Sequence, residues 1–103
     1  INNGIDIRAN EGDRVVSVGG GTVMRVEWYR SYGKMVMIDH GGGVYSLYTH
    51  LSDVSVTGGA QVTEGQTIAR VGSTGSLEGP LLHFEIREGA RAVDPRTWLK
   101  RSM

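Results

Sequence analysis

The chain has 103 residues, of which 39% are hydrophobic, and its 11 basic and 11 acidic side chains give a formal net charge of zero. This length fits one domain with a single hydrophobic core and leaves no room for a second domain. A neutral chain argues against nucleic acid as a partner, because phosphate binding needs a positive surface. The lack of cysteine excludes disulfides and thiol catalysis, and no apolar run approaches the ~18 residues that would span a membrane.

Short strands separated by glycine clusters are the dominant pattern. Segments rich in Val, Ile, Met and Tyr predict seven strands, at residues 4–7, 14–18, 22–28, 34–40, 44–50, 67–71 and 82–87. Residues 29–33 and 41–43 predict the turns on either side of the fourth strand. Only residues 95–100 have the composition of a helical turn, so the chain is predicted to be all-β.

A short motif occurs twice. Gly12 and Val15 match Gly59 and Val62 as Gly-x-x-Val, and each copy is followed by a second glycine-linked strand. This repetition indicates two copies of a small hairpin unit, although chance recurrence in a glycine-rich chain is the alternative. We therefore expect a compact barrel-like sandwich of antiparallel strands with a duplicated hairpin motif.

The histidines at positions 40, 50 and 83 are too far apart for a helix-borne metal motif, so they can meet only through a sheet. Asp39, His40 and Ser46 contain the residue types of a serine-hydrolase triad. The sequence lacks the Gly-x-Ser-x-Gly turn that presents such a serine. The three glycines after His40 are therefore interpreted as a hairpin loop.

Several separated segments follow a specific order along the chain. They are Asn2-Asn3-Gly4-Ile5-Asp6, then Tyr48-Thr49-His50, then Leu81-Leu82-His83-Phe84-Glu85, and Val93-Asp94-Pro95 ahead of Trp98. This order resembles the lysostaphin/LytM-type zinc endopeptidase domain, which cuts peptide cross-links in bacterial peptidoglycan. The resemblance covers nearly the whole chain.

The resemblance assigns roles to individual positions. Active family members read His-x-Gly-x-Asp in the first segment and His-x-His in the last, so Asp6 and His83 correspond to zinc ligands and His50 to a catalytic histidine. Asn2 stands where the first zinc ligand is expected, and Leu81 stands where the second catalytic histidine is expected. Catalytic zinc usually has three protein ligands, so the remaining pair is expected to bind zinc weakly at most. Leucine cannot transfer a proton, and we therefore predict a catalytically inactive domain.

Among family members with degenerate sites, the chain resembles the EnvC-type and NlpD-type murein hydrolase activators, most clearly in residues 84–87 and 91–99. The resemblance implies a regulator of cell division in the bacterial envelope, most specifically the periplasm. Its former substrate groove is expected to bind a zinc-dependent N-acetylmuramoyl-L-alanine amidase and to relieve the autoinhibition of that enzyme. Because the chain starts at Ile1 without an initiator methionine, we expect residues 1–103 to be one domain of a longer protein.

A groove that binds a partner needs apolar and aromatic anchors with a few charged groups. Alternation along a strand places Leu81, His83 and Arg87 on one face, and the resemblance places the substrate cleft there. The predicted partner-binding residues are Tyr32, Met35, Tyr48, His50, Leu81, His83 and Arg87.

Two other functions remain open at this point. One is a true zinc endopeptidase whose first ligand comes from sequence upstream of Ile1, although Leu81 would still be missing as a catalytic group. The other is a module that binds peptidoglycan without altering any enzyme. Metal content separates the first alternative from the activator, and a response to an amidase separates the second.

Overall fold

All seven predicted strands are present in the structure, a computed structural model that describes residues 4–96. The elements in chain order are β1 (Ile5–Arg8), β2 (Arg14–Val16), β3 (Gly21–Trp28), the 3-10 turn η1 (Arg30–Tyr32), β4 (Lys34–Asp39), β5 (Val44–Val54), β6 (Gln61–Val62), β7 (Thr67–Val71), β8 (Leu81–Glu88) and β9 (Arg91–Val93). The sequence did not predict β6 and β9, which pair with the start of β3 and the end of β8. The helical turn predicted for residues 95–100 extends outside the described residues.

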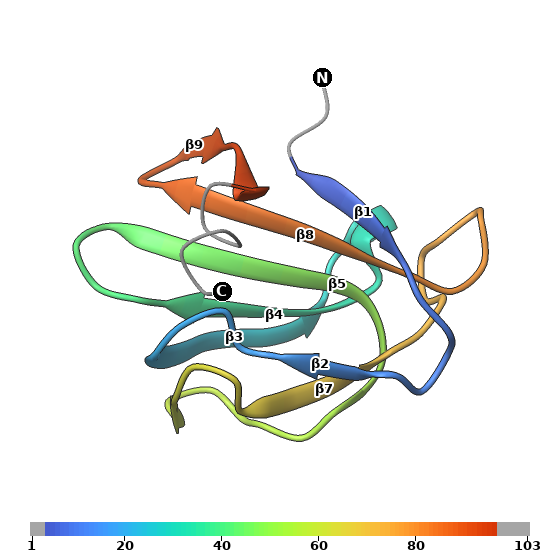
Figure 1. The fold of residues 1–103 in the computed structure, drawn as a ribbon, viewed down its shortest axis with the longest axis horizontal. Helices are drawn as coiled ribbons and strands as arrows, with labels where there is room; N and C mark the ends of the chain where they lie inside the picture. Colours follow the sequence, from blue (N-terminus) through green and yellow to red (C-terminus); the bar gives the residue numbers. More distant parts are fainter. Residues whose placement is uncertain (1–3, 97–103) are drawn as a thin grey trace.

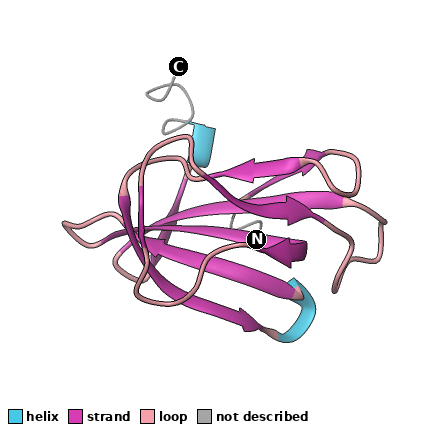
Figure 2. Cartoon of the chain, turned by 90° about the horizontal axis from the view of Figure 1, so that it is seen from below, coloured by secondary structure: helices cyan, strands magenta, loops and turns pink. Residues whose placement is uncertain are grey.

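Antiparallel pairing joins the strands in the order β1-β8-β5-β4-β3-β6, and β2 pairs with β7, which in turn pairs with β5. In Figure 1, β8, β5, β4 and β3 follow one another from top to bottom, and β2 and β7 lie together below them. Figure 2 shows the same strands from below, with turns and loops gathered at the two ends of the domain. The fold is all-β and antiparallel, as the sequence predicted.

The hydrophobic core lies on one face of the central strands. Val36, Tyr48 and Ile86 from β4, β5 and β8 are at most 1% exposed. They belong to one cluster with Val15 from β2 and Ile68 from β7. Each such side chain stabilises the fold by about 1.5–3 kcal/mol when it leaves water. The side chains on the opposite face of the central strands therefore do not belong to this core.

A β-bulge changes which residues of β3 share a face. Strict alternation along residues 22–28 would place Val23, Arg25 and Glu27 on one side. In the structure Val23 pairs with Ile38 and is buried, and the register shifts between Val23 and Arg25. The extra residue, Met24, moves Arg25 and Glu27 to the face opposite the core. Val23 therefore does not share a face with Arg25 and Glu27, because a bulge interrupts the two-residue period.

The two Gly-x-x-Val motifs have the same local structure. Gly12 and Gly59 adopt φ angles of +92° and +90°, which favour glycine. Each turn leads into a short strand whose valine, Val15 or Val62, is 2% or 4% exposed. The repetition in the sequence thus corresponds to a repeated turn and a repeated buried contact.

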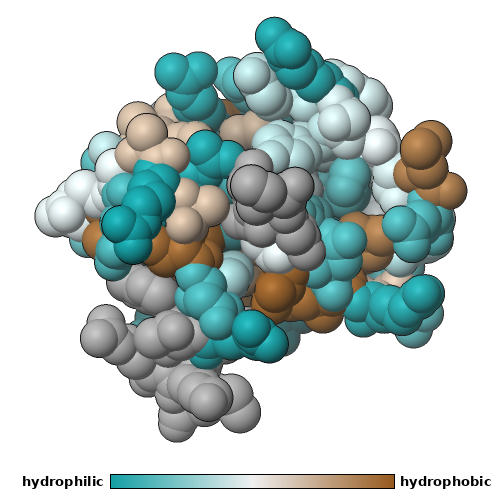
Figure 3. Space-filling view, turned by 90° about the horizontal axis from the view of Figure 1, so that it is seen from above, coloured by the Kyte–Doolittle hydropathy of each residue, from teal (hydrophilic) through white to brown (hydrophobic). Residues whose placement is uncertain are grey.

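Large apolar side chains on the surface are concentrated near β3. Six are exposed within residues 4–96, and four of them lie at positions 24, 26, 28 and 29. Figure 3 shows another face of the domain, where small separate apolar patches lie among hydrophilic side chains. Within the same residues, no helix is long and apolar enough to cross a membrane.

Candidate functional site

The first feature of the site is a histidine held between two carboxylates. Asp6 on β1 lies directly opposite His83 on β8. The Nδ1 atom of His83 is 2.6 Å from Asp6 Oδ1, and its Nε2 atom is 2.8 Å from Glu85 Oε2. A neutral imidazole has only one N–H group, so two carboxylate partners favour the doubly protonated ring. The hydrogen bond to Glu85 raises the pKa of His83; burial opposes this, Asp6 adds to it, and the pKa is raised overall.

Glu85 is the centre of this arrangement, and its side chain is fully buried. Besides His83, the Tyr32 hydroxyl donates to Oε2 over 2.7 Å, and the Arg87 guanidinium donates to Oε1 through Nε at 3.0 Å and Nη2 at 2.8 Å. Burial by itself would raise the pKa of Glu85, but these hydrogen bonds outweigh it and lower the pKa below its ordinary value. The carboxylate therefore stays ionised inside the domain. We call Asp6, His83, Glu85, Arg87 and Tyr32 the Glu85 network.

The residues at two expected zinc positions contact each other directly in this network. The Nδ1 atom of His83 lies 2.6 Å from Oδ1 of Asp6, which is a hydrogen-bond distance, whereas ligand atoms around tetrahedral zinc lie about 3.3 Å from one another. Zinc binding would therefore have to displace this hydrogen bond and its proton. Within residues 4–96, no three His, Cys, Asp or Glu side chains are arranged to hold a metal ion. Asn2, at the position predicted for the first ligand, lies outside the described residues.

His50 and Leu81 lie beside the network. The backbone of His50 has a φ of +64°, a left-handed conformation that is uncommon for residues other than glycine and asparagine. Its Nδ1 atom lies 2.8 Å from the Thr74 carbonyl oxygen, and its ring centroid is 6.3 Å from that of His83. Leu81 is two residues before His83 on β8 and only 8% exposed. An apolar side chain therefore stands where the resemblance expects a second catalytic histidine.

Tyr48 does not line the groove. It is 1% exposed, pairs with Val36 and Phe84, and belongs to the hydrophobic core. Simple alternation placed Tyr48 and His50 on one face of β5. The left-handed backbone at His50 breaks that alternation and turns the histidine toward His83 on the other face. The groove position predicted for Tyr48 is therefore wrong.

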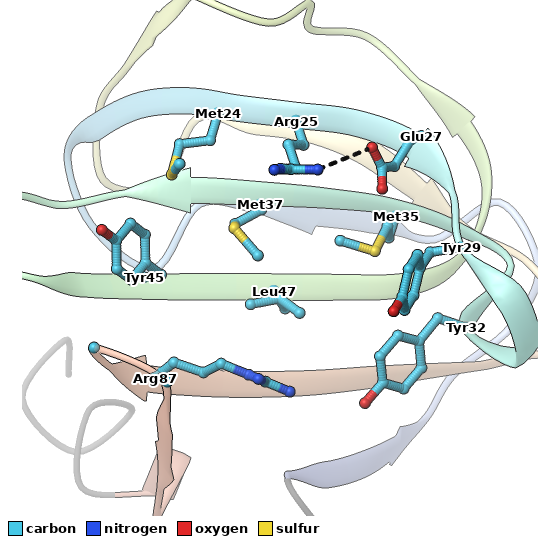
Figure 4. Close-up of a pocket in the computed structure, with 12 residues that line it drawn as sticks. Met24, Arg25, Glu27, Tyr29, Tyr32, Met35, Met37, Tyr45, Leu47 and Arg87 are labelled. Atoms are coloured by element: carbon cyan, nitrogen blue, oxygen red, sulfur yellow. Dashed lines mark ion pairs between the residues drawn. The ribbon is translucent and has the colours of Figure 1, made fainter.

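Next to the Glu85 network, the face opposite the core carries a groove with a volume of about 520 Å³. Figure 4 shows side chains from β3, β4, β5 and β8 lining this space, with Tyr29 and Tyr32 at one end. The lining residues are Met24, Arg25, Glu27, Tyr29, Tyr32, Met35, Met37, Tyr45, Leu47, Arg87, Gly89 and Ala90. Tyr32 and Arg87 thus belong both to the groove and to the network, and Met35 also lines the groove.

The sequence prediction missed several lining residues and the central role of Glu85. Met37 and Leu47 follow Met35 and Tyr45 at a spacing of two, so alternation would have placed each pair on one face. Arg25 and Glu27 keep the same spacing on β3. A search for paired positions on adjacent strands would therefore have found most of the groove floor.

The alternative triad does not form a reactive site. His40 Nε2 lies 2.7 Å from Ser46 Oγ, but Ser46 is fully buried and its hydroxyl donates to Tyr48. His40 Nδ1 lies 2.8 Å from the Gly20 carbonyl, at the position that a triad acid would need. These contacts brace the hairpin of β4 and β5, and a substrate has no access to Ser46.

The chain is similar to known proteins both in sequence and in fold. The profile of peptidase family M23 matches residues 1–95. Murein hydrolase activator EnvC of Escherichia coli (strain K12) is 43% identical over 95% of this chain, and lipoprotein NlpD/LppB homolog of Pseudomonas aeruginosa is 42% identical over 98%. These matches span only 23% and 34% of the two relatives. The catalytic domain of the antimicrobial peptidase lysostaphin from Staphylococcus simulans superimposes with a TM-score of 0.90 at 31% identity, covering 95% of this chain and 78% of that domain.

Proposed function

Because this chain belongs to peptidase family M23, we propose that it is a catalytically inactive member that binds and activates a peptidoglycan N-acetylmuramoyl-L-alanine amidase. The observation that carries this proposal is the Glu85 network. His83 donates to two carboxylates, so its protonated ring supplies the positive charge that zinc would supply in a peptidase. The similarity to the murein hydrolase activator EnvC supports the same function.

Loss of hydrolysis follows from two positions in particular. Leu81 cannot act as an acid or base, and a positioned group of that kind is typically worth about 10²–10⁴ in rate. Asn2 stands where the first zinc ligand is expected, so only two of the three usual protein ligands remain, and a metal would also have to displace the hydrogen bond between His83 and Asp6. The two losses together remove both the Lewis acid and a proton-transfer group.

The composition of the groove supports a protein as its ligand. Three methionines and three tyrosines line it, together with two arginines and a glutamate. Methionine side chains adapt to irregular partner surfaces, and tyrosine and arginine are frequent energetic anchors of protein interfaces. We therefore propose that a segment of the amidase occupies the groove, with its apolar side chains on Met35 and Met37.

We also propose that the domain works in the bacterial envelope, most specifically the periplasm, as one part of a longer protein. The matched relatives are named as a murein hydrolase activator and a lipoprotein, and the matched region is a minor part of each. We propose peptidoglycan as a second ligand of the same groove.

Direct binding to a cognate amidase tests the use of the groove. We expect Met37→Glu to weaken the affinity at least tenfold, because it replaces an apolar contact surface of the groove with a charged side chain that must lose water when the partner binds. Met37 is the better probe than Tyr32 or Arg87, since those two also hold buried Glu85.

The matched control is Val16→Glu, which makes the same kind of exchange at an exposed position on β2 outside the groove. Titration of a labelled amidase with each variant gives the dissociation constants. Unchanged affinity in Met37→Glu, or an equal loss in both variants, would overturn the proposed binding surface.

A further inference from the structure

The outer edge of β3 has no partner strand along most of its length. β6 pairs only with Gly21 and Thr22, and the Val23 N–H group donates to the Ala60 carbonyl. From position 24 to Trp28, no strand within residues 4–96 pairs with this edge. Figure 4 shows β3 as the outermost of the four strands that carry the groove. Free edges of this kind are the places where a further strand can add to a sheet.

The backbone of this edge is oriented for pairing. The Tyr29 N–H group donates to the Gly33 carbonyl across the β3–β4 hairpin, over 2.9 Å. Inward and outward groups alternate along an antiparallel strand, so the N–H and C=O groups of Val26 and Trp28 point away from β4. The two residues are 37% and 61% exposed, which places these apolar side chains at the surface beside the free backbone groups.

The two charged residues that flank Val26 have opposite signs, so they can pair with the same two residues of an antiparallel second copy. They are Arg25 and Glu27, and both lie on the groove face, opposite Met37 and Met35 of β4. Their side chains are 59% and 37% exposed, and Arg25 Nη1 lies 3.6 Å from Glu27 Oε1. An antiparallel copy of this strand, centred on Val26, would place a glutamate opposite each arginine.

We propose that a second copy of this chain pairs with this edge, with Val26 of each β3 strand lying at a twofold axis. The two Val26 residues then exchange both backbone hydrogen bonds, and Arg25 of each copy faces Glu27 of the other. Trp28 lies diagonally across from the second Val26, a distance that an aromatic side chain can bridge. Such an interface is isologous, so it closes as a dimer and does not continue into a filament.

The dimer would join two sheets edge to edge. Because side chains keep their face across an antiparallel pair, both grooves lie on the same side of the joined sheet. The contact is small, so we expect a weak dimer with a dissociation constant of roughly 0.1–1 mM. This inference concerns a surface outside the Glu85 network, and it holds whether or not the groove binds an amidase.

Sedimentation equilibrium of the 103-residue chain at low salt tests the pairing by exchanging charges. Arg25→Glu alone opposes two pairs of glutamates, and Glu27→Arg alone opposes two pairs of arginines, so each variant is expected to dimerise at least tenfold more weakly. An equimolar mixture of the two variants restores an opposite charge at every contact. We expect this mixture to form a heterodimer about as strong as the wild-type dimer.

Val26→Pro provides an independent variant. It removes the outward N–H group without removing a bond to β4, and proline is tolerated on an edge strand at such a position. It is expected to abolish the dimer while circular dichroism retains the wild-type spectrum. A wild-type chain that stays monomeric at about 2 mM, or a dimer that survives the single charge changes, would overturn the proposal. A monomer would leave the edge available to a strand of another protein.

Discussion

Glu85 keeps a full negative charge inside the domain because its surroundings are almost entirely donors. Both oxygens accept hydrogen bonds, from His83 and Tyr32 on one side and from Arg87 on the other. Removal of one partner from a buried ion pair leaves the others uncompensated, and this is far more costly than the net worth of the pair. The network is therefore expected to be a structural requirement of the domain.

Glu85→Ala tests this requirement. It leaves a protonated His83 and the Arg87 guanidinium without their shared acceptor, so we expect the free energy of unfolding to fall by about 3–5 kcal/mol. Urea denaturation followed by circular dichroism measures the change. Glu11→Ala, at an exposed position, is the control and should change stability by less than about 0.5 kcal/mol. A loss below about 1 kcal/mol at Glu85 would contradict the proposed role.

The same network gives the domain a defined pH dependence. The pKa of His83 is raised above 6.5, so its stabilising contribution is fully present below 6.5 and is lost as the pH rises through the folded-state value. The pKa of Glu85 is lowered below 4.5, so its contribution is present above 4.5 and is lost as the pH falls through the folded-state value. Stability from this pair is therefore greatest between these limits.

His83→Gln isolates the histidine contribution. We expect the difference in unfolding free energy between wild type and variant to be larger at about pH 5.5 than at about pH 9, because a histidine with a raised pKa loses its stabilising proton as the pH rises. Urea titrations of both proteins at the two pH values give the difference. The same difference at both values would show that the charge of His83 does not contribute.

At the scale of elements, the two-residue period predicted the strands well but could not predict where that period breaks. Leu81, His83 and Arg87 share a face of β8 as expected. Tyr48 was misplaced because residue type alone does not reveal the left-handed backbone at His50. The strands β6 and β9 were missed because their sequences, QV and RAV, are not part of a longer run of the Val, Ile, Met and Tyr residues that marked the other strands.

The turn that carries Tyr32 is fixed by a glycine contact. Gly33 has a φ of +66° and a ψ of −144°, and a Cβ atom at this position would lie 2.2 Å from the Thr74 carbonyl oxygen. The turn and the loop that follows β7 are therefore packed backbone against backbone. Any side chain at Gly33 must push the turn outward and move Tyr32 away from Glu85.

Gly33→Ala is expected to lower the free energy of unfolding by about 3 kcal/mol or more, since steric overlap adds to backbone strain. Gly42→Ala is the matched control, because Gly42 has a φ of +62° but no atom within 4 Å of the added Cβ. We expect the control to lose only about 1–2 kcal/mol. Chemical denaturation compares the two variants, and equal losses would mean that contact with Thr74 does not constrain the turn.

At the scale of the whole molecule, one sheet serves two purposes. The core packs on one face of the central strands and the groove lies on the other, so groove side chains that do not hold Glu85 can change without loss of the fold. The sequence resemblance assigned roles to Asp6, His83 and Leu81. It did not give the hydrogen bonds of His83 or the burial of Glu85, which depend on contacts between β1, β8 and the Tyr32 turn.

Release of dye from labelled peptidoglycan, with zinc present in every sample, tests amidase activation directly. Three samples are compared: the domain alone, a cognate zinc-dependent amidase alone, and the two together. We predict no release by the domain alone and release by the mixture well above the level of the amidase. Release by the domain alone would make it a peptidase, and a mixture that does not exceed the amidase would contradict activation.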